Sequence, residues 1–358
     1  MKKINFLTMM LSVAVIVSLI VVSACTKEGP MGPAGKDGED GINGTNGTDG
    51  TAVCGVCHNF SEDLTAKVAQ YNKSMHAMGT TSFEGNRTSC APCHTSKGFR
   101  EVIANDTTET LAPISNPTQP NCYTCHNIHQ TYTDTDWALA TTDPVTFRFN
   151  AGNPGLQFDG GNGNLCVNCH QSRTINPYPD INNLTGTVTV GNFRYGPHYG
   201  PQSQILSGQA GFNVGITGST SHKHYEWIEN TCTDCHMAEP FGQLAGGHNM
   251  SVYIEEEESY NWAGCTSCHD DEDALATNTE ELMTEVTDLE AQLWTLLVNE
   301  GIADANNYGY AVPGTYSNLV AGTFLNWKFV HHDRCKGLHN PTYVKALLNN
   351  SIEALGGK

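Results

Sequence analysis

The sequence has few basic residues. Lys and Arg total 18 against 37 Asp and Glu, which gives a formal net charge of −19. Proteins bind nucleic acids through basic patches, so this balance argues against nucleic acid as a partner. Electrostatic attraction instead favours basic proteins, metal cations or minerals.

Long apolar runs are also scarce. Residues 4–22 are almost uncharged and follow two lysines, which is typical of a secretory signal peptide. The run ends in two small residues before Cys25 and so resembles a bacterial lipobox. That resemblance implies removal of residues 1–24 and attachment of lipid to Cys25. A retained membrane anchor is the alternative, because about 18 apolar residues can span a bilayer.

Both alternatives predict that the chain is exported. We expect a lipid anchor in the bacterial cell envelope, facing the periplasm or lying at the outer membrane and cell surface. No later segment is apolar enough to cross a membrane.

Residues 25–50 contain a glycine repeat. From Gly29 to Gly50, glycine recurs at every third position, which is the collagen register. Only the first two triplets contain proline, so we interpret the repeat as a flexible spacer behind the lipidated cysteine. A trimeric collagen-like stalk is the alternative.

Cysteine, in contrast, is abundant. Twelve of the 14 cysteines lie in six copies of the pattern Cys-x-x-Cys-His. Two thiols at this spacing can each bond one vinyl group of a porphyrin, and the following His supplies an iron ligand. A redox pair or half a zinc site needs no His directly after the second Cys. The pattern therefore predicts six covalently bound c-type haems, attached at Cys54/Cys57/His58, Cys90/Cys93/His94, Cys122/Cys125/His126, Cys166/Cys169/His170, Cys232/Cys235/His236 and Cys265/Cys268/His269.

Residues 51–273 form the predicted hexahaem domain. This stretch lacks a sustained hydrophobic period of 2 or 3.6 and is rich in Gly, Asn, Thr and Pro. We predict a mostly α-helical fold with extensive irregular loops, in which short helices carry the motifs and porphyrins form much of the core. Residues 187–190 alternate Thr and Val, which favours a strand.

Residues 274–358 lack the motif and form a predicted helical segment packed on the haem domain. Apolar residues at helical spacing predict a helix over 279–300, with Gly301 at its end. We expect further helices over 317–331 and from Asn340, an N-cap residue followed by Pro341. These helices are expected to cover the last haems or to form a subunit contact.

Six irons need six further ligands if all are six-coordinate. The sequence has 15 histidines; six lie in motifs, which leaves nine. His129 lies three residues after His126 and cannot easily bind the same iron, so it is expected to reach a neighbouring haem. His331 and His332 end a helix, where a cationic His is favourable, and are not assigned to iron. The predicted second ligands are His76, His129, His198, His224, His248 and His339, with His222 as the alternative to His224 and Met75, Met78 and Met250 as alternative thioether ligands.

Several stretches resemble the bis-histidine multihaem c-type cytochromes of respiring, often metal-reducing bacteria. The helical end is similar to the C-terminal helices of the nitrite reductase and hydroxylamine oxidoreductase superfamily. The stretches that carry the resemblance are 70–76, 122–129, 196–202, 232–237 with 246–248, and 337–343.

This resemblance implies bis-His ligation, closely packed haems and electron transfer in anaerobic or extracellular respiration. Other redox proteins or extracellular electron acceptors would be the partners. The sequence departs from pentahaem nitrite reductases because it has no Cys-x-x-Cys-Lys motif. We therefore expect an electron-transfer protein and assign no catalytic residue.

The sequence also allows other functions and sites. A reductase of nitrogen or sulfur oxyanions would need one open haem, with polar groups such as Arg148, Arg173, Arg194, Tyr195 and Tyr199 above it. A filament of stacked subunits, or another oligomer, is a further alternative. Cys335 belongs to no motif and is either a free thiol or half of an intermolecular disulfide. The acidic residues 270–273 offer a possible Ca²⁺ site.

Overall fold

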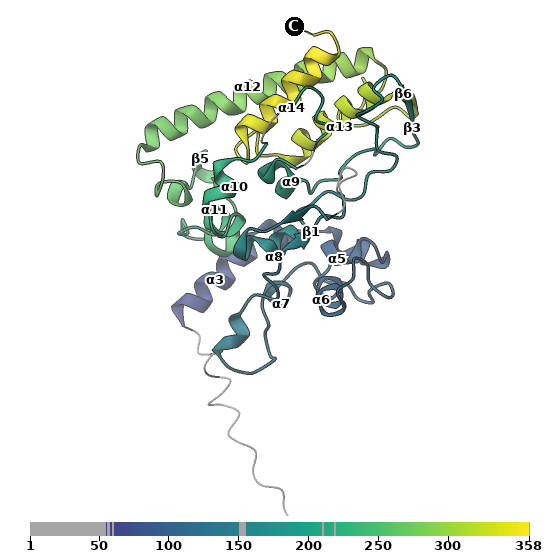
Figure 1. Ribbon diagram of the computed structural model, residues 1–358. Coiled ribbons are helices and arrows are strands. Elements are labelled where there is room, and N and C mark those ends of the chain that lie inside the picture. Colours follow the sequence, from purple (N-terminus) through teal and green to yellow (C-terminus); the bar gives the residue numbers. More distant parts are fainter. Residues whose placement is uncertain are drawn as a thin grey trace, which may run out of the picture. The chain divides into compact units, whose positions relative to one another are not determined.

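The computed structural model describes Gly55, His58 and residues 61–149, 155–209, 211–217 and 220–357. The predicted signal peptide, the lipidation site Cys25, the glycine repeat and two motif cysteines, Cys54 and Cys57, lie outside these residues. The described residues belong to one compact unit, in which helices and irregular loops predominate (Figure 1). The predicted fold class is confirmed.

Short helices make up the first part of this unit. Four motifs lie wholly or partly on such helices, namely those at α5, α7, α8 and α11. Each motif helix is only four or five residues long, as expected where Gly, Asn and Pro interrupt the chain. The helices are α3 (Glu62–Lys73), α4 (Met75–Met78), α5 (Ala91–His94), α6 (Ser96–Asn105), α7 (Cys122–Cys125), α8 (Asn164–Val167), α9 (Gln202–Ser207), α10 (Lys223–Trp227) and α11 (Cys232–His236).

The sixth motif departs from this pattern. Short helices were expected to carry the motifs, but residues 265–268 form a turn that follows the 3₁₀-helix η6 (Trp262–Gly264). The Cys268 amide closes the turn by donating to the Cys265 carbonyl at 3.1 Å. The expectation of a motif helix was therefore wrong for Cys268. The next helix, α12 (Glu272–Asn299), begins separately and is capped by the Asp271 side chain.

Among the described residues, sheet is limited to three antiparallel strand pairs. The predicted strand at 187–190 is confirmed, with its two valines buried and its two threonines exposed. Its partner lies over a hundred residues later, directly before a long helix. The pairs are β1 (Val145–Thr146) with β2 (Gln157–Phe158), β3 (Thr187–Val190) with β6 (Gly314–Ser317), and β4 (Tyr253–Ile254) with β5 (Ser259–Tyr260).

Three longer helices follow the last motif: α12 (Glu272–Asn299), α13 (Asn318–Asp333) and α14 (Pro341–Ala354). They pack against one another (Figure 1). Asn340 caps α14 as predicted, by accepting from the Tyr343 amide. The predicted start of the first helix was wrong. It begins at Glu272, because the Asp271 side chain accepts the Ala274 amide at 2.9 Å. Its first turns carry mainly polar side chains, which hydrophobic periodicity does not detect.

The apolar core lies mainly between these three helices and the segments they cover. The large fully buried side chains Trp327, Phe324, Phe329 and Leu293 belong to it, together with Val190 of β3. In residues 61–140, by contrast, the buried apolar side chains are Ala91, Pro92, Phe99, Val102 and Ile114. The first motif helices therefore have little apolar core of their own. Among the described residues, none of the helices combines the length and hydropathy needed to span a bilayer.

Candidate functional site

The structure brings each motif histidine close to one histidine from outside the motifs. We number the resulting sites 1 to 6 by the order of their motifs. In every site the two ring centres lie 6.1–6.4 Å apart, although in several sites the partners are about a hundred residues or more apart in sequence. The pairs are His58–His129 (site 1), His94–His198 (site 2), His126–His248 (site 3), His170–His76 (site 4), His236–His339 (site 5) and His269–His224 (site 6).

This spacing is too long for ring stacking and suits a metal ion between the rings. Two imidazoles that bind one ion from opposite sides through bonds of about 2 Å have ring centres about 6 Å apart. The described motif cysteines form no disulfides, so their thiols are free for attachment. The residues therefore fit a haem iron in each of the six places.

The motif cysteines differ in their exposure. Most of those in the described part of the chain are partly buried, but Cys122 and Cys268 are exposed. Where the attached porphyrins lie stays a prediction. The Ser267 hydroxyl contacts the Cys268 sulfur at 3.8 Å, and residues 267–274 are exposed along their whole length.

The exposure of Cys268 has a local cause. The residues on both sides of it, 266–273, are polar or acidic, so the chain has no apolar side chain there to cover the thiol. Cys265, at the other end of the motif, is partly buried, and burial raises the pKa of its thiol. Attachment at Cys268 stays a prediction.

Backbone carbonyls fix the tautomer of three of the paired rings. Nδ1 of His126 lies 2.6 Å from the carbonyl oxygen of Trp137. Nδ1 of His236 lies 2.9 Å from that of Met250, and Nδ1 of His224 lies 3.2 Å from that of Leu338. A carbonyl only accepts, so Nδ1 carries the proton in all three rings. The Nε2 lone pair is then available to a metal.

Side chains hold Nδ1 of further rings. His129 contacts the Tyr123 hydroxyl at 2.8 Å, and His94 contacts that of Thr81 at 3.0 Å. The His170 ring lies 3.3 Å from Gln202, and His339 lies 2.7 Å from the Asp333 carboxylate. In His76, Nδ1 lies 3.2 Å from the Met250 sulfur. These contacts orient the rings from behind, as partners of metal-bound histidines do.

Burial lowers the pKa of several paired histidines. The pKa falls to about 4 in both His170 and His198, and burial of the ring is the main cause in each case. Burial also lowers the pKa of His76, His236 and His248. These rings are therefore neutral near pH 7, which is the protonation state that binds metal.

The histidines that were not assigned to iron have other contacts. His222 accepts the His224 amide through its ring and caps α10, so the structure pairs His224 rather than His222 with a motif. His331 contacts Glu290, and the ring of His332 donates to the carbonyl of His198.

The alternative thioether ligands are differently placed. Met75 and Met78 are largely exposed. Met250 lies behind the His76 ring, on its Nδ1 side, rather than between two rings.

Protein contacts place neighbouring sites side by side. The Cys169 thiol lies 3.7 Å from the Pro92 carbonyl, which joins the motifs of sites 2 and 4. His129 of site 1 lies three residues from His126 of site 3. Sites 3 and 4 meet through α3, because the Gln70 side chain accepts the His248 amide at 3.0 Å and α4, which carries His76, follows directly.

Sites 4, 5 and 6 are joined in the same way. The Thr231 hydroxyl donates to the Gly160 carbonyl at 3.0 Å, which packs the start of the fifth motif against the turn before the fourth. Gly264 precedes the sixth motif, where a Cβ atom would lie 3.0 Å from Cα of Cys235 and 2.8 Å from the Asp234 carbonyl. The glycine therefore allows the fifth and sixth motifs to touch.

His248 follows two glycines, and the structure gives them a physical role. Gly246 and Gly247 have φ of 68° and 47°, a region that favours glycine. A Cβ on Gly247 would lie 2.4 Å from the Gln70 side-chain oxygen. Gly247 thus permits a close approach to α3.

Residues proposed for an open catalytic site have structural contacts. Arg148 donates to the Cys93 sulfur, and Arg173 donates to the carbonyls of Gly196 and Arg194. The buried Tyr195 donates to the Pro177 carbonyl.

The suggested Ca²⁺ residues, 270–273, are exposed, and Asp271 among them caps α12. Among the described residues, they do not form part of a cluster of ligand atoms that could hold a metal ion.

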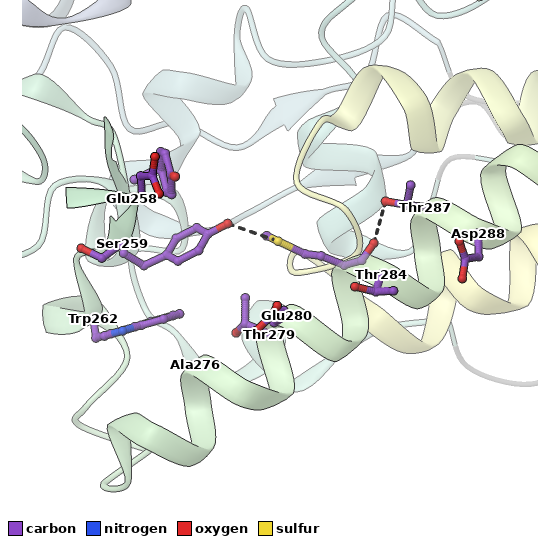
Figure 2. Close-up of a pocket in the computed structure, with 12 residues that line it drawn as sticks. Glu258, Ser259, Trp262, Ala276, Thr279, Glu280, Thr284, Thr287 and Asp288 are labelled. Atoms are coloured by element: carbon purple, nitrogen blue, oxygen red, sulfur yellow. Dashed lines mark hydrogen bonds between the residues drawn. The ribbon is translucent and has the colours of Figure 1, made fainter. Parts of the chain in front are cut away.

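A cavity of about 600 Å³ lies beside α12 (Figure 2). Its lining comes from the segment 253–262, which includes Trp262, and from α12, which contributes Thr279, Glu280 and Asp288. None of the paired histidines lines it. We therefore place the candidate site at the histidine pairs and not at this cavity.

Sequence reasoning missed the groups behind the rings. Tyr123, Gln202 and Asp333 contact Nδ1 of His129, His170 and His339, but no spacing in the sequence identified them as partners of these rings. Tyr123 occupies a variable position within its motif, and Gln202 lies 32 residues from its partner. Only the folded chain brings these groups to the rings.

Comparisons with known proteins give distant structural similarities. No protein-family model matches the sequence, and the curated proteins contain no match. The chain is similar to the outer cell wall cytochrome OcwA, with 17% identity and a TM-score of 0.49 over 81% of this chain and 50% of that one. It is similar to an undecahaem cytochrome from the S-layer of Carboxydothermus ferrireducens, with 16% identity and a TM-score of 0.42 over 82% and 40%.

A third similar structure is the cytochrome c nitrite reductase of Desulfovibrio desulfuricans. The identity is 13% and the TM-score 0.38, over 81% of this chain and 69% of that one. All three structures are cytochromes by name. The chain spans half the length of the first and two fifths of the second.

Proposed function

We propose that the protein is a multihaem c-type cytochrome that carries six covalently attached haems and transfers electrons. The observation that carries this proposal is the set of six histidine pairs at 6.1–6.4 Å, each of which joins a motif histidine to another histidine. Chance proximity would not select one partner for every motif. Two protein ligands at each iron leave no open position, which favours electron transfer over catalysis at a haem.

Each group of residues would have its own role. The twelve motif cysteines attach the porphyrins, and the six motif histidines bind iron from one side. His76, His129, His198, His224, His248 and His339 bind from the other side. Carbonyls and side chains at Nδ1 hold the rings in the ligating tautomer. When bound, haem supplies one-electron chemistry, and the protein controls ligation, burial and spacing.

The contacts between motifs support this role. Direct protein contacts join site 2 to site 4 and join sites 4, 5 and 6 to one another, while α3 and α4 link sites 3 and 4. Adjacent sites are what transfer among attached cofactors requires. Redox proteins or extracellular electron acceptors are the proposed partners.

We also propose export and a lipid anchor at Cys25, on the basis of the sequence of residues 4–25. The anchor would hold the cytochrome to the cell envelope through the spacer of residues 25–50. Mass spectrometry of the mature N-terminus tests this. A diacylglycerol-modified Cys25 supports the proposal, and an intact Met1 contradicts it.

Carbon monoxide binding to the dithionite-reduced protein tests the proposed ligation. Mass spectrometry should first give a mass increase equal to six haems. No change in the visible spectrum on addition of carbon monoxide is then expected, because each iron has two strong protein ligands. A change equal to one haem would reveal an open iron and redirect attention to nitrite, hydroxylamine and sulfite reduction.

A further inference from the structure

Site 5 differs from the other sites in what lies behind its ligand. The Nδ1 atom of His339 lies 2.7 Å from Oδ1 of Asp333, whose side chain is 1% exposed. Among the described residues, the other Nδ1 partners of paired histidines are carbonyl, hydroxyl, amide or thioether groups. Site 5 is thus the place where a buried carboxylate faces a paired ring.

The cysteine outside the motifs completes this arrangement. The Cys335 thiol donates to Oδ2 of Asp333 at 2.6 Å, and its sulfur accepts the His339 amide at 3.3 Å. Asp333 therefore has one oxygen toward the ring and the other toward the thiol. This arrangement gives the Cys335 thiol hydrogen-bonding contacts within the chain.

The loop between α13 and α14 creates this arrangement. Asp333 is the last residue of α13, and the chain turns back through Arg334, Lys336 and Gly337, which have φ of 65°, 53° and 95°. This backbone brings Cys335 and His339 to the carboxylate that precedes them. The three groups lie within 4.8 Å of one another.

These three side chains could themselves hold a metal ion, but the hydrogen bonds favour another role. Each Asp333 oxygen already accepts a proton donor, one from the ring and one from the thiol. The other face of the site is formed by His236, whose ring centre lies 6.3 Å from that of His339. With iron bound at site 5, a carboxylate, a histidine and a metal would lie in series.

We propose that Asp333 is a positioning residue that holds His339 on the iron of site 5 and lowers the reduction potential of that haem, with Cys335 moderating its charge. This inference rests on the proposed function. A buried negative charge at Nδ1–H increases electron donation from the imidazole. It therefore favours the oxidised iron, which carries one more positive charge. Reduction adds one electron to the site, while the proton on Nδ1 stays in place.

Two substitutions should shift the potential in opposite directions. Asp333→Asn keeps an oxygen that can accept from Nδ1 but removes the charge. We expect one of the six components of a redox titration to rise by about 60 mV, which corresponds to a tenfold change in the ratio of oxidised to reduced haem. Cys335→Ala removes the thiol donor, leaves more charge for His339, and should lower the same component.

The measurement is a potentiometric titration of the six-haem protein, followed by electron paramagnetic resonance so that low-spin signals are resolved. Asp288→Asn is the matched control, because it removes the same charge from an exposed position on α12. It should leave all six components in place. Asp333→Glu, which restores a carboxylate, should return the shifted component toward its original potential.

The outcomes separate this inference from the proposed function. An Asp333→Asn protein with six haems and unshifted components overturns the inference, as does an equal shift of all six. If that variant yields no six-haem protein, an unshifted Cys335→Ala protein overturns it. His339→Ala tests the ligand itself. If the His339→Ala protein contains no haem that binds carbon monoxide, the ligation proposed for site 5 is wrong. If it contains one such haem but Asp333→Asn shifts no reduction potential, only the present inference is wrong.

Discussion

The paired histidines differ from the remaining ones in what their rings face. His198 lies 6.2 Å from the ring of His94, whereas His331 stacks on Trp327 and contacts Glu290. We predict that His198→Ala converts one low-spin haem into a high-spin haem that binds one equivalent of carbon monoxide. His331→Ala is the control and should leave the spectrum unchanged. An identical response of the two variants would contradict the assignment of site 2.

The glycine before His248 offers a second test on a single residue. Gly247→Ala places a methyl group 2.4 Å from the Gln70 oxygen, while Gly242→Ala meets nothing within 4 Å. Both positions have positive φ, so both variants carry a left-handed strain of about 1–2 kcal/mol. Gly247→Ala should in addition displace the His248 segment from α3.

Spectroscopy and thermal unfolding can distinguish the two glycine variants. Gly247→Ala should weaken the low-spin signal of site 3 and lower the midpoint of thermal unfolding further than Gly242→Ala does. If the two midpoints and spectra agree, crowding against Gln70 is not what requires the glycine.

The sequence predicted the residues of the site but not how they pair. The motif spacing identified candidate attachment points, and the surplus of histidines identified the six residues that the structure pairs with the motifs. Their role as iron ligands stays a prediction. The pairing itself could not be predicted, because His76 meets a motif far downstream while His339 meets one upstream. Spacing also gives no information about the groups that surround each motif.

At the scale of elements, α12 is joined to α13 and the following loop by a buried carboxylate. Glu290 is 2% exposed, and its two oxygens contact His331 at 3.2 Å and Lys336 at 2.7 Å. We predict that Glu290→Gln lowers the free energy of unfolding by about 1–3 kcal/mol, because charge-assisted hydrogen bonds of a buried group are lost. The partial exposure of Lys336 keeps the loss below that of a fully buried pair.

The same helix offers a matched control for this prediction. Glu285→Gln removes the pair with Lys345, in which both side chains are more than a third exposed. Such pairs contribute about 0–1 kcal/mol. Denaturant unfolding of the two variants would contradict the role of Glu290 if both lost equally little.

The helices themselves were predicted better than their ends. Apolar spacing identified α12, and the sequence Asn-Pro identified the start of α14. The start of α12 was missed because its first turns are polar and are stabilised by a side-chain cap, not by burial. The pairing of β3 with β6 was not predictable, since the partner strand of four residues has no alternating pattern.

At the scale of the described unit, apolar burial is uneven. The main core joins α12, α13 and α14, whereas residues 61–140 bury few apolar side chains. A chain segment with little apolar burial cannot offset the entropy of ordering by itself. We predict that protein made without haem keeps amide protection in the three long helices and loses it in α3, α5, α6 and α7.

Hydrogen exchange followed by mass spectrometry checks this prediction. The haem-loaded protein is the reference and should be protected in both regions. Equal protection of the two regions in the haem-free protein would contradict a core that depends on the porphyrins.

The order of the paired histidines along the chain has a consequence for synthesis. A site gains its second histidine only when the later of the two has been made. In chain order, His129 completes site 1, His170 site 4, His198 site 2, His248 site 3, His269 site 6 and His339 site 5. Site 5 is therefore completed last, long after its own motif has emerged. A chain that stops between the last motif and His339 would carry every attachment point and still leave His236 without its partner.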